Sequence, residues 1–409
     1  MKKFASISEV ADYHGCTGCG ACSYADSSVS MKDDHGNGLR PTSEGSSSSA
    51  LAVCPGAELD RSSLIASDSD AEMDPMWGPV LAVYEGYASD NSVRSNGSSG
   101  GMITALSRYA LESGAVEGVL HTVGSPADPS VTTPKLSRST EEVLAASGSR
   151  YAVSSPLSGL AAALDQVDSL LFVGKPCDAA GLHKISQQDE IARNSIGLSL
   201  SFFCAGTPST SGNKQYIENQ LGGKPEPLHS LKYRGEGWPG LWEASGTVSG
   251  KQASATATYA ESWGKLQASR QWRCYICPDH SGEYADIALG DAWYKTPDGV
   301  NPGSSLIVVR TERGKRFLES AVSAGVVTLV KEDRTLIDQC QSYLVDSRGE
   351  LWGRLLAMKV AMLRTPVFKG YPTFRFWIKL NAKRKVGSVL GTLKRVFRKK
   401  LYANEVRLK

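Results

Sequence analysis

The stretch Leu170-Leu-Phe-Val-Gly-Lys-Pro-Cys177-Asp-Ala-Ala-Gly-Leu182 decides the fold class of this 409-residue chain. Residues 170–173 are all apolar and are followed directly by a Gly-Lys-Pro turn, so they predict a short buried strand. A helix is expected to begin at the turn, because proline is well suited to the first helical position. A strand that leads through a tight turn into a helix is the repeating unit of α/β proteins.

The same alternation extends to both sides of this stretch. Strands are predicted over 80–84, 118–123, 196–203 and 306–310, helices over 101–112, 209–221 and 313–324, and an antiparallel hairpin over 241–260. Together they predict an α/β core (an α+β mixed sheet) within residues 81–335. Residues 61–80 are polar and carry two turn signals, so they are expected to form a linker.

Composition sets the class of protein. The net charge is only +3, so the overall charge does not indicate binding to nucleic acid. There is no run of about 18 apolar residues, so no transmembrane helix is predicted, and the first residues lack the apolar segment of a secretory signal. Nine cysteines in a chain of this length are typical of a cytoplasmic redox protein, and an odd number does not suit a disulfide scaffold.

Four cysteines in residues 1–60 predict an iron–sulfur module. Cys16, Cys19 and Cys22 are three residues apart, and a remote Cys54 precedes a proline. Three thiolates at this spacing suit three corners of a 4Fe–4S cluster, and Cys54 suits the fourth, as in a ferredoxin-like module. Asp26 stands where a two-cluster ferredoxin has another cysteine, which favours one cluster. A zinc site and inert thiols are the alternatives. The serine-rich stretch 43–49 inside the module predicts a loop.

A second set of four cysteines lies in the α/β region. Cys274 and Cys277 form a C-x₂-C pair, Cys177 follows one predicted strand, and Cys204 follows another. The carboxyl ends of parallel strands share one edge of a sheet, so these four thiols are candidates for a second tetrathiolate site. The alternative is that Cys177 and Cys204 are buried as small apolar residues, which is the role expected of Cys340.

The C-terminal region, residues 336–409, is predicted to be helical and increasingly basic. From Lys379 onward there are eleven Lys and Arg and one acidic residue, so this tail carries +10 and the rest of the chain −7. Within 383–401, apolar residues recur near helical spacing between basic ones, although Gly387 and Gly391 weaken a helix. Three interpretations are open: a solvated tail, peripheral contact with an anionic membrane, and docking of an acidic partner such as ferredoxin.

Several motifs in sequence order resemble the coenzyme F420 hydrogenase/dehydrogenase beta-subunit family, which includes the 7-hydroxymethyl chlorophyll a reductase type. Besides the two cysteine sets, the matching segments are Asn96-Gly-Ser-Ser-Gly-Gly-Met102, the Gly174–Leu182 stretch, Phe203-Cys-Ala-Gly-Thr-Pro208, Tyr233-Arg-Gly-Glu-Gly-Trp-Pro-Gly240 and Ala285-Asp-Ile-Ala-Leu-Gly-Asp-Ala-Trp293. The resemblance spans roughly residues 12–330. The resemblance implies bound FAD and two 4Fe–4S clusters, one in each cysteine set. It also implies that electrons pass between a one-electron partner and a two-electron acceptor.

The residue types in these motifs suit a flavin site, although each also has a structural explanation. The cofactor-binding candidates are Ser98, Ser99, Gly100, Gly101, Lys175, Tyr233, Arg234, Trp238 and Asp291. The Ser/Gly group precedes a helix whose N-terminus suits a pyrophosphate, or it is an ordinary cap. Lys175 suits a phosphate or a reduced flavin, or is solvated. The aromatic residues suit the flavin ring, or form a rigid turn. Asp291 suits a ribose hydroxyl, or caps a turn.

The leading hypothesis is therefore an iron–sulfur flavoprotein oxidoreductase, or an electron-transfer subunit of one. A ferredoxin-like protein is the expected donor, an organic molecule such as coenzyme F420 is the expected acceptor, and no catalytic residue is named. One alternative is a reductase for a sugar or other intermediate of exopolysaccharide or cell-envelope synthesis. Another is a zinc-binding structural protein without redox turnover. A homo-oligomer is compatible with each hypothesis.

Overall fold

A computed structural model describes residues 3–42, 48–64, 70–298 and 301–401 of the protein. Its centre is an eight-stranded sheet. In spatial order the strands are β16 (Val327–Glu332), β6 (Ala82–Ala88), β15 (Ser305–Val309), β14 (Ile287–Asp291), β10 (Ile196–Phe202), β9 (Leu170–Gly174), β7 (Gly118–Gly124) and β8 (Thr132–Ser137). The neighbours β14, β10, β9 and β7 run parallel, and the other adjacent pairs are antiparallel. The predicted mixed α/β sheet is confirmed.

Strand β9 shows why this sheet is the core of the molecule. Its residues alternate between two apolar clusters, so that Leu171 and Val173 face one side and Leu170 and Phe172 the other. All four side chains are buried. Helices α5 (Met102–Glu112) and α13 (Glu312–Ser323) cover the first face, and α7 (Leu160–Leu164) and α8 (Pro176–Gln188) cover the second. A strand covered on both faces is continuously apolar, as the sequence is here.

Most predicted elements of the core are confirmed within a few residues. Helices α10 (Thr210–Leu221) and α13 begin after Ser209 and Thr311, whose side chains accept hydrogen bonds from backbone amides in the first turn. The strand predicted over 80–84 is corrected. Residues 78–80 form β5 (Gly78–Val80), which pairs with β4 (Glu72–Asp74), and the core strand β6 begins only at Ala82.

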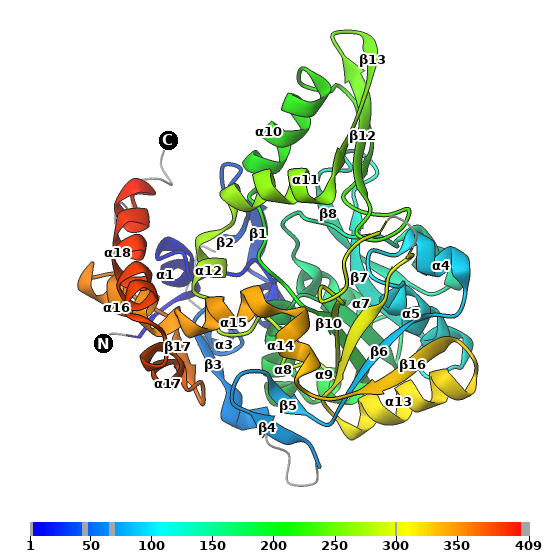
Figure 1. Ribbon diagram of the computed structural model, residues 1–409, viewed down its shortest axis with the longest axis horizontal. Coiled ribbons are helices and arrows are strands. Elements are labelled where there is room, and N and C mark those ends of the chain that lie inside the picture. Colours follow the sequence, from blue (N-terminus) through cyan, green and yellow to red (C-terminus); the bar gives the residue numbers. More distant parts are fainter. Residues whose placement is uncertain (1–2, 43–47, 65–69, 299–300, 402–409) are drawn as a thin grey trace.

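A three-stranded sheet projects from the core, at the top of Figure 1. The predicted hairpin is confirmed as β12 (Leu241–Val248) and β13 (Lys251–Thr258), and β11 (Leu228–Lys232) adds a strand that the sequence did not predict. Helices α10 and α11 (Tyr259–Leu266) pack against this sheet. The remaining helical segments of the central region are α4 (Asn91–Asn96), α6 (Thr140–Ala145), η2 (Pro156–Gly159), α9 (Glu190–Ser195), η3 (Gln267–Ser269) and α12 (Trp272–Tyr275).

The N-terminal segment is packed into the body of the protein. Its elements are α1 (Ile7–Asp12), α2 (Ala21–Ala25), β1 (Ser30–Asp33), β2 (Leu39–Thr42), α3 (Ser48–Ala52) and β3 (Glu58–Asp60). Residues 43–47 of the predicted serine loop lie outside the described residues, and Ser48 already begins α3. The segment expected to be a linker is instead anchored, since the short helix η1 (Arg61–Leu64) buries Arg61 in an ion pair with Glu283.

Helices dominate the C-terminal region, which extends from the centre of Figure 1 to its left edge. They are α14 (Leu336–Cys340), α15 (Ser342–Gly349), α16 (Leu351–Val360), α17 (Thr373–Ile378) and α18 (Ala382–Arg398). Between them, β17 (Val367–Lys369) pairs in parallel with β3, which joins the two ends of the chain. None of the helices in the described ranges is long and apolar enough to cross a membrane.

Candidate functional site

The carboxyl ends of three parallel strands bring predicted site residues to one edge of the sheet. Lys175 follows β9, Cys204 follows β10, and Asp291 ends β14. All three line a cavity of about 520 Å³, a volume within the range of about 300–1,000 Å³ that small-molecule sites occupy. This is the edge where the strand order predicted a ligand to bind.

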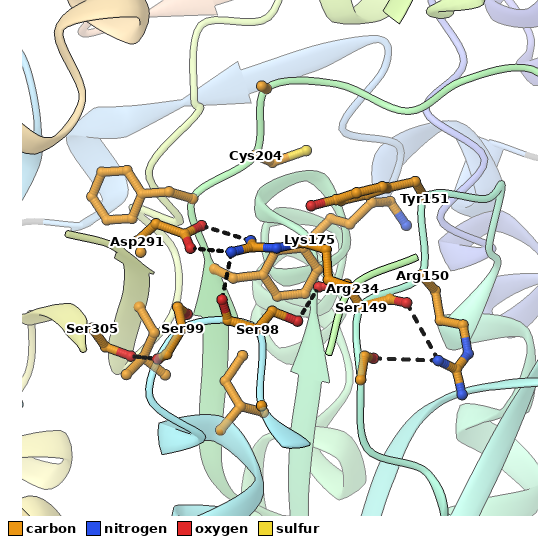
Figure 2. Close-up of a pocket in the computed structure, with 18 of the residues that line it drawn as sticks. Ser98, Ser99, Ser149, Arg150, Tyr151, Lys175, Cys204, Arg234, Asp291 and Ser305 are labelled. Carbon is orange, nitrogen blue, oxygen red and sulfur yellow. Dashed lines mark hydrogen bonds and ion pairs between the residues drawn. The ribbon is translucent and has the colours of Figure 1, made fainter. Parts of the chain in front are cut away.

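The Ser/Gly turn before α5 forms another part of the cavity wall, and Figure 2 shows it beneath Arg234. Ser98, Ser99 and Gly101 line the cavity, and the Ser98 hydroxyl is 2.5 Å from that of Ser149. Gly101 has φ 68°, and a Cβ there would lie 2.4 Å from the Val93 carbonyl oxygen, so the turn requires glycine. Among the described residues, no side chain caps α5, so its first amides remain available for an anion.

Arg234 and Asp291 form a rigid ion pair in the cavity wall (Figure 2). The guanidinium donates to both carboxylate oxygens, at 3.1 and 2.7 Å, and also to the carbonyl oxygens of Ser98 and Pro239. Burial opposes the charge of Arg234, but the Asp291 carboxylate outweighs it and raises the pKa of the guanidinium. The pair therefore stays charged and ties three chain segments together.

Lys175 is a buried cation with its own counter-ion. It is the N-cap residue of α8, and its ammonium group lies 2.7 Å from the Asp178 carboxylate and also donates to Ser154. Burial opposes the charge, yet Asp178 outweighs it, so the pKa of Lys175 lies above its ordinary value. The lysine thus places a fixed positive charge at the wall.

Three of the predicted cofactor-binding residues stand behind the wall. Tyr233 is buried and packs edge-on against Tyr151, with ring centroids 5.6 Å apart. Trp238 is also buried and donates from its indole nitrogen to Asp291 at 3.0 Å. Gly100 faces Ser304 and Tyr87. These residues support those that line the cavity.

The cavity also contains residues that the sequence did not single out. Arg150 and the aromatic side chains Tyr151, Tyr259, Trp263 and Trp293 line it. Arg150 donates to the carbonyl oxygens of Gly148 and Ser149, and in the described part of the chain it forms no ion pair with a carboxylate. No spacing connects Arg150 to the distant aromatic residues, so a motif search does not find them.

The first cysteine set converges as predicted. Cys16, Cys19, Cys22 and Cys54 line one small cavity together with apolar residues such as Ile7 and Val10. Burial raises the pKa of Cys19 to about 12 and that of Cys54 to about 11, and neighbouring cysteines add to the effect. Cys16, Cys19 and Cys22 are buried and Cys54 is partly buried, so a bound metal centre would be needed to stabilise the four thiols as thiolates.

The second set comes from three segments, with Cys177 in α8, Cys204 after β10, and Cys274 and Cys277 in and just after α12. The amide of Cys204 donates a hydrogen bond of 2.9 Å to the carbonyl oxygen of His280. The ring of His280 donates one of 2.9 Å to the carbonyl oxygen of Cys204. The Thr207 amide lies 3.4 Å from the Cys274 sulfur. Burial raises the pKa of Cys204 to about 12 and that of Cys277 to about 11, and in each case interaction with Cys274 contributes.

Helix α8 connects the two cysteine sets with the cavity. Its first turn carries Cys177, which interacts electrostatically with Cys204 of the second set and with Cys19 of the first. A Cβ at Gly181, one turn further, would lie 3.4 Å from the Cys19 sulfur. Lys175, at the start of the helix, lines the cavity.

Within the described ranges, no three His, Cys, Asp or Glu side chains form a group that could hold a metal ion.

Comparison with known families matches two models that adjoin each other. Both describe the beta subunit of coenzyme F420 hydrogenase/dehydrogenase. The model of its N-terminal part matches residues 83–161, and the model of its C-terminal part matches residues 167–335. Together the two matches cover more than half of the chain, including the cavity residues of the sheet edge.

Individual relatives and a solved structure agree with this match. The coenzyme F420 hydrogenase subunit beta of Methanococcus voltae is 28% identical over 61% of this chain and 84% of its own length. The F420-dependent formate dehydrogenase subunit beta of Methanocaldococcus jannaschii is 22% identical over 71% of each chain. A chain of the F420-reducing NiFe hydrogenase complex from Methanosarcina barkeri has the same fold, with a TM-score of 0.55 and 20% identity over 73% of this chain and 99% of its own.

Proposed function

The chain belongs to the coenzyme F420 hydrogenase/dehydrogenase beta-subunit family, and we propose that it is an iron–sulfur flavoprotein oxidoreductase, or an electron-transfer subunit of one. A ferredoxin-like protein is the proposed donor and an organic molecule is the proposed two-electron acceptor. The names of the relatives make coenzyme F420 the first acceptor to test. In this role 4Fe–4S clusters supply one-electron transfer, and FAD supplies the conversion to two-electron chemistry.

The proposed cluster ligands are the two cysteine sets. Cys16, Cys19, Cys22 and Cys54 would hold the first cluster, and Cys177, Cys204, Cys274 and Cys277 the second. All eight are buried or partly buried, and burial keeps solvent away from such a centre.

FAD is proposed to bind in the 520 Å³ cavity. The uncapped N-terminus of α5 and the guanidinium of Arg150 suit its pyrophosphate. The aromatic side chains suit its ring system, since they provide flat apolar surfaces. Lys175 and Arg234 hold positive charge at the wall, which would stabilise an anionic ligand, while Asp178 and Asp291 fix their positions.

The observation that carries the proposal is the course of α8. One helix begins at the cavity, carries Cys177 in its first turn, and packs Gly181 against Cys19. Its buried position on the sheet keeps both cysteine sets and the cavity at fixed relative positions. A zinc-binding structural protein would need no large cavity beside its metal sites.

Anaerobic purification with iron, sulfide and flavin quantified tests the proposal. We expect about eight irons per chain and bound flavin, because two 4Fe–4S clusters are proposed. Cys274→Ser should lower iron to about four per chain, because only the second cluster loses a ligand. Cys340→Ser is the matched control, since Cys340 is buried outside both sets, and it should keep its iron.

Three results would contradict this assignment. A colourless protein that contains only zinc would support the structural alternative. Unchanged iron content in Cys274→Ser would remove the second cluster from the proposal, and iron of about four per chain in the unaltered protein would do the same.

A further inference from the structure

Helix α18 turns its apolar side away from the protein. Val386 and Leu390 are 56% and 59% exposed, and they are followed on the same face by Leu393 and Phe397, at spacings of three and four residues. The buried residues of the helix are Ser388, Thr392 and Val396. We call Val386, Leu390, Leu393 and Phe397 the apolar row. Residues two positions apart on a helix point about 200° apart, so the apolar row and the buried residues lie on opposite sides of α18. A helix of a soluble protein normally has the reverse orientation.

The inward face explains why the helix docks in this orientation. Ser388 accepts a hydrogen bond from the indole nitrogen of Trp377 at 3.0 Å. Gly353 on α16 provides the space for this contact, since a Cβ there would lie 2.1 Å from the Ser388 hydroxyl oxygen. Close packing of small residues and hydrogen bonds holds α18 in place. The apolar row is therefore not needed for this packing.

The charges around the apolar row are of one sign. Between Leu351 and Asn404 the sequence has fourteen Lys and Arg and neither Asp nor Glu. Arg384 faces inward and pairs with Asp346 and Glu350. Lys383, Lys394 and Arg398 are exposed, and none of them is in an ion pair in the described part of the chain.

Helix α17, next to α18, also exposes apolar side chains beside basic ones. Phe374 and Ile378, four residues apart, are 49% and 52% exposed. The neighbouring Arg375 and Lys379 are also exposed. Because the indole of Trp377 on α17 donates a hydrogen bond to Ser388 on α18, the two helices lie together at the edge of the molecule (Figure 1).

We propose that α17 and α18 form a docking surface for an anionic lipid bilayer, with α18 lying along the headgroup layer. Apolar side chains flanked by cations, on a helix of low overall hydrophobicity, suit the boundary between anionic headgroups and acyl chains. An acidic protein would match the cations but would leave the apolar row without a partner. A second copy of the chain would bring like charges together.

Co-sedimentation of the full chain with lipid vesicles tests the proposal. We expect binding to phosphatidylcholine vesicles that contain phosphatidylglycerol, little binding to phosphatidylcholine alone, and weaker binding at high salt. The double variant Val386→Ser/Leu390→Ser should lower the affinity about tenfold or more, because it removes two inserting side chains. Ile191→Ser on α9, which is 69% exposed, is the matched control and should not change binding.

A charge variant separates the two contributions. Lys383→Gln/Lys394→Gln should weaken binding about fivefold per lysine, whereas the exposed control pair Lys251→Gln/Lys265→Gln should not. Equal binding to neutral and anionic vesicles would overturn the proposal, and so would unchanged binding of Val386→Ser/Leu390→Ser. Light scattering that shows a dimer lost in that variant would overturn it in favour of a second copy. Iron and flavin content should stay unchanged in all these variants, so this test is independent of the proposed function.

Discussion

Single residues determine the rigidity of the cavity wall, and Arg234 is the clearest case. Its guanidinium reaches the carbonyl of Ser98, the carbonyl of Pro239 and the carboxylate of Asp291, which belong to three distant segments. Trp238 adds a further hydrogen bond to the same carboxylate. A ligand that enters the cavity would thus meet groups whose positions are already fixed, which lowers the cost of ordering them on binding.

Replacement of Arg234 should destabilise the protein. Arg234→Met removes one partner of a buried pair and leaves Asp291 uncompensated, so we expect a loss of about 3–5 kcal/mol in the free energy of unfolding, measured in urea. Arg108→Met is the matched control, because Arg108 also pairs with an aspartate, Asp90, but the side chain of that aspartate is 49% exposed. The control should lose less than about 1 kcal/mol. Equal losses in both variants would show that burial of the pair is unimportant.

At the scale of elements, the close approach of α16 and α18 depends on one glycine. A Cβ at Gly353 would lie 2.1 Å from the Ser388 oxygen and 2.6 Å from the Trp377 indole nitrogen. Both distances are far below van der Waals contact, so the neighbours must move to admit an added methyl group. Helix α18 can therefore present its small, polar side to α16 only while residue 353 is glycine.

Gly353→Ala should loosen α18. We expect a loss of about 1–3 kcal/mol from overpacking, and faster proteolysis within residues 382–401 because that helix opens locally. Gly387→Ala is the matched control on α18, since a Cβ there meets nothing within 4 Å. That variant should gain about 0.5–1 kcal/mol, because alanine favours a helix. A protease-resistant Gly353→Ala protein would contradict the expected displacement.

At the scale of the whole molecule, one buried carboxylate joins the N-terminal, central and C-terminal regions. Glu283 pairs with Arg61 at 2.7 Å and with Arg348 at 2.5 Å, and all three side chains are almost fully buried. Arg310 lies beside them and donates to the carbonyl oxygens of Trp77 and Pro79. The N-terminal and C-terminal regions are thus coupled through ionic contacts in addition to the β3–β17 pairing.

Glu283→Ala should therefore weaken the whole protein. It leaves two arginines buried without their shared counter-ion, and we expect a loss of about 3–5 kcal/mol, measured by tryptophan fluorescence in urea. Glu58→Ala is the matched control, because Glu58 also joins the chain ends through Lys3 and Lys369, but its side chain is only partly buried and both lysines are exposed. The control should change stability much less, since solvent screens its ion pairs. Similar losses in both variants would argue against a special role for the buried network.

The sequence by itself determined the local part of this structure. Apolar runs and turn residues predicted β9, β7, β10, α5 and α10 within a few residues, since periodicity and capping depend on near neighbours. The spacing of Cys16, Cys19 and Cys22 predicted that these thiols gather, and with Cys54 they line one cavity. Because the carboxyl ends of parallel strands share an edge, the sequence also predicted that Cys177 and Cys204, each after a predicted strand, lie at one edge of the sheet.

Only the tertiary structure decided which distant segments converge. Arg150 and Tyr151, Tyr259, and Trp293 reach one cavity from three distant segments. Tyr233 and Trp238 stand behind its wall although they belong to the same motif as Arg234. The outward orientation of the α18 apolar row likewise depends on packing against Gly353. Periodicity shows which residues share a face of an element. It does not show which other element covers that face, because that choice depends on packing between residues far apart in the chain.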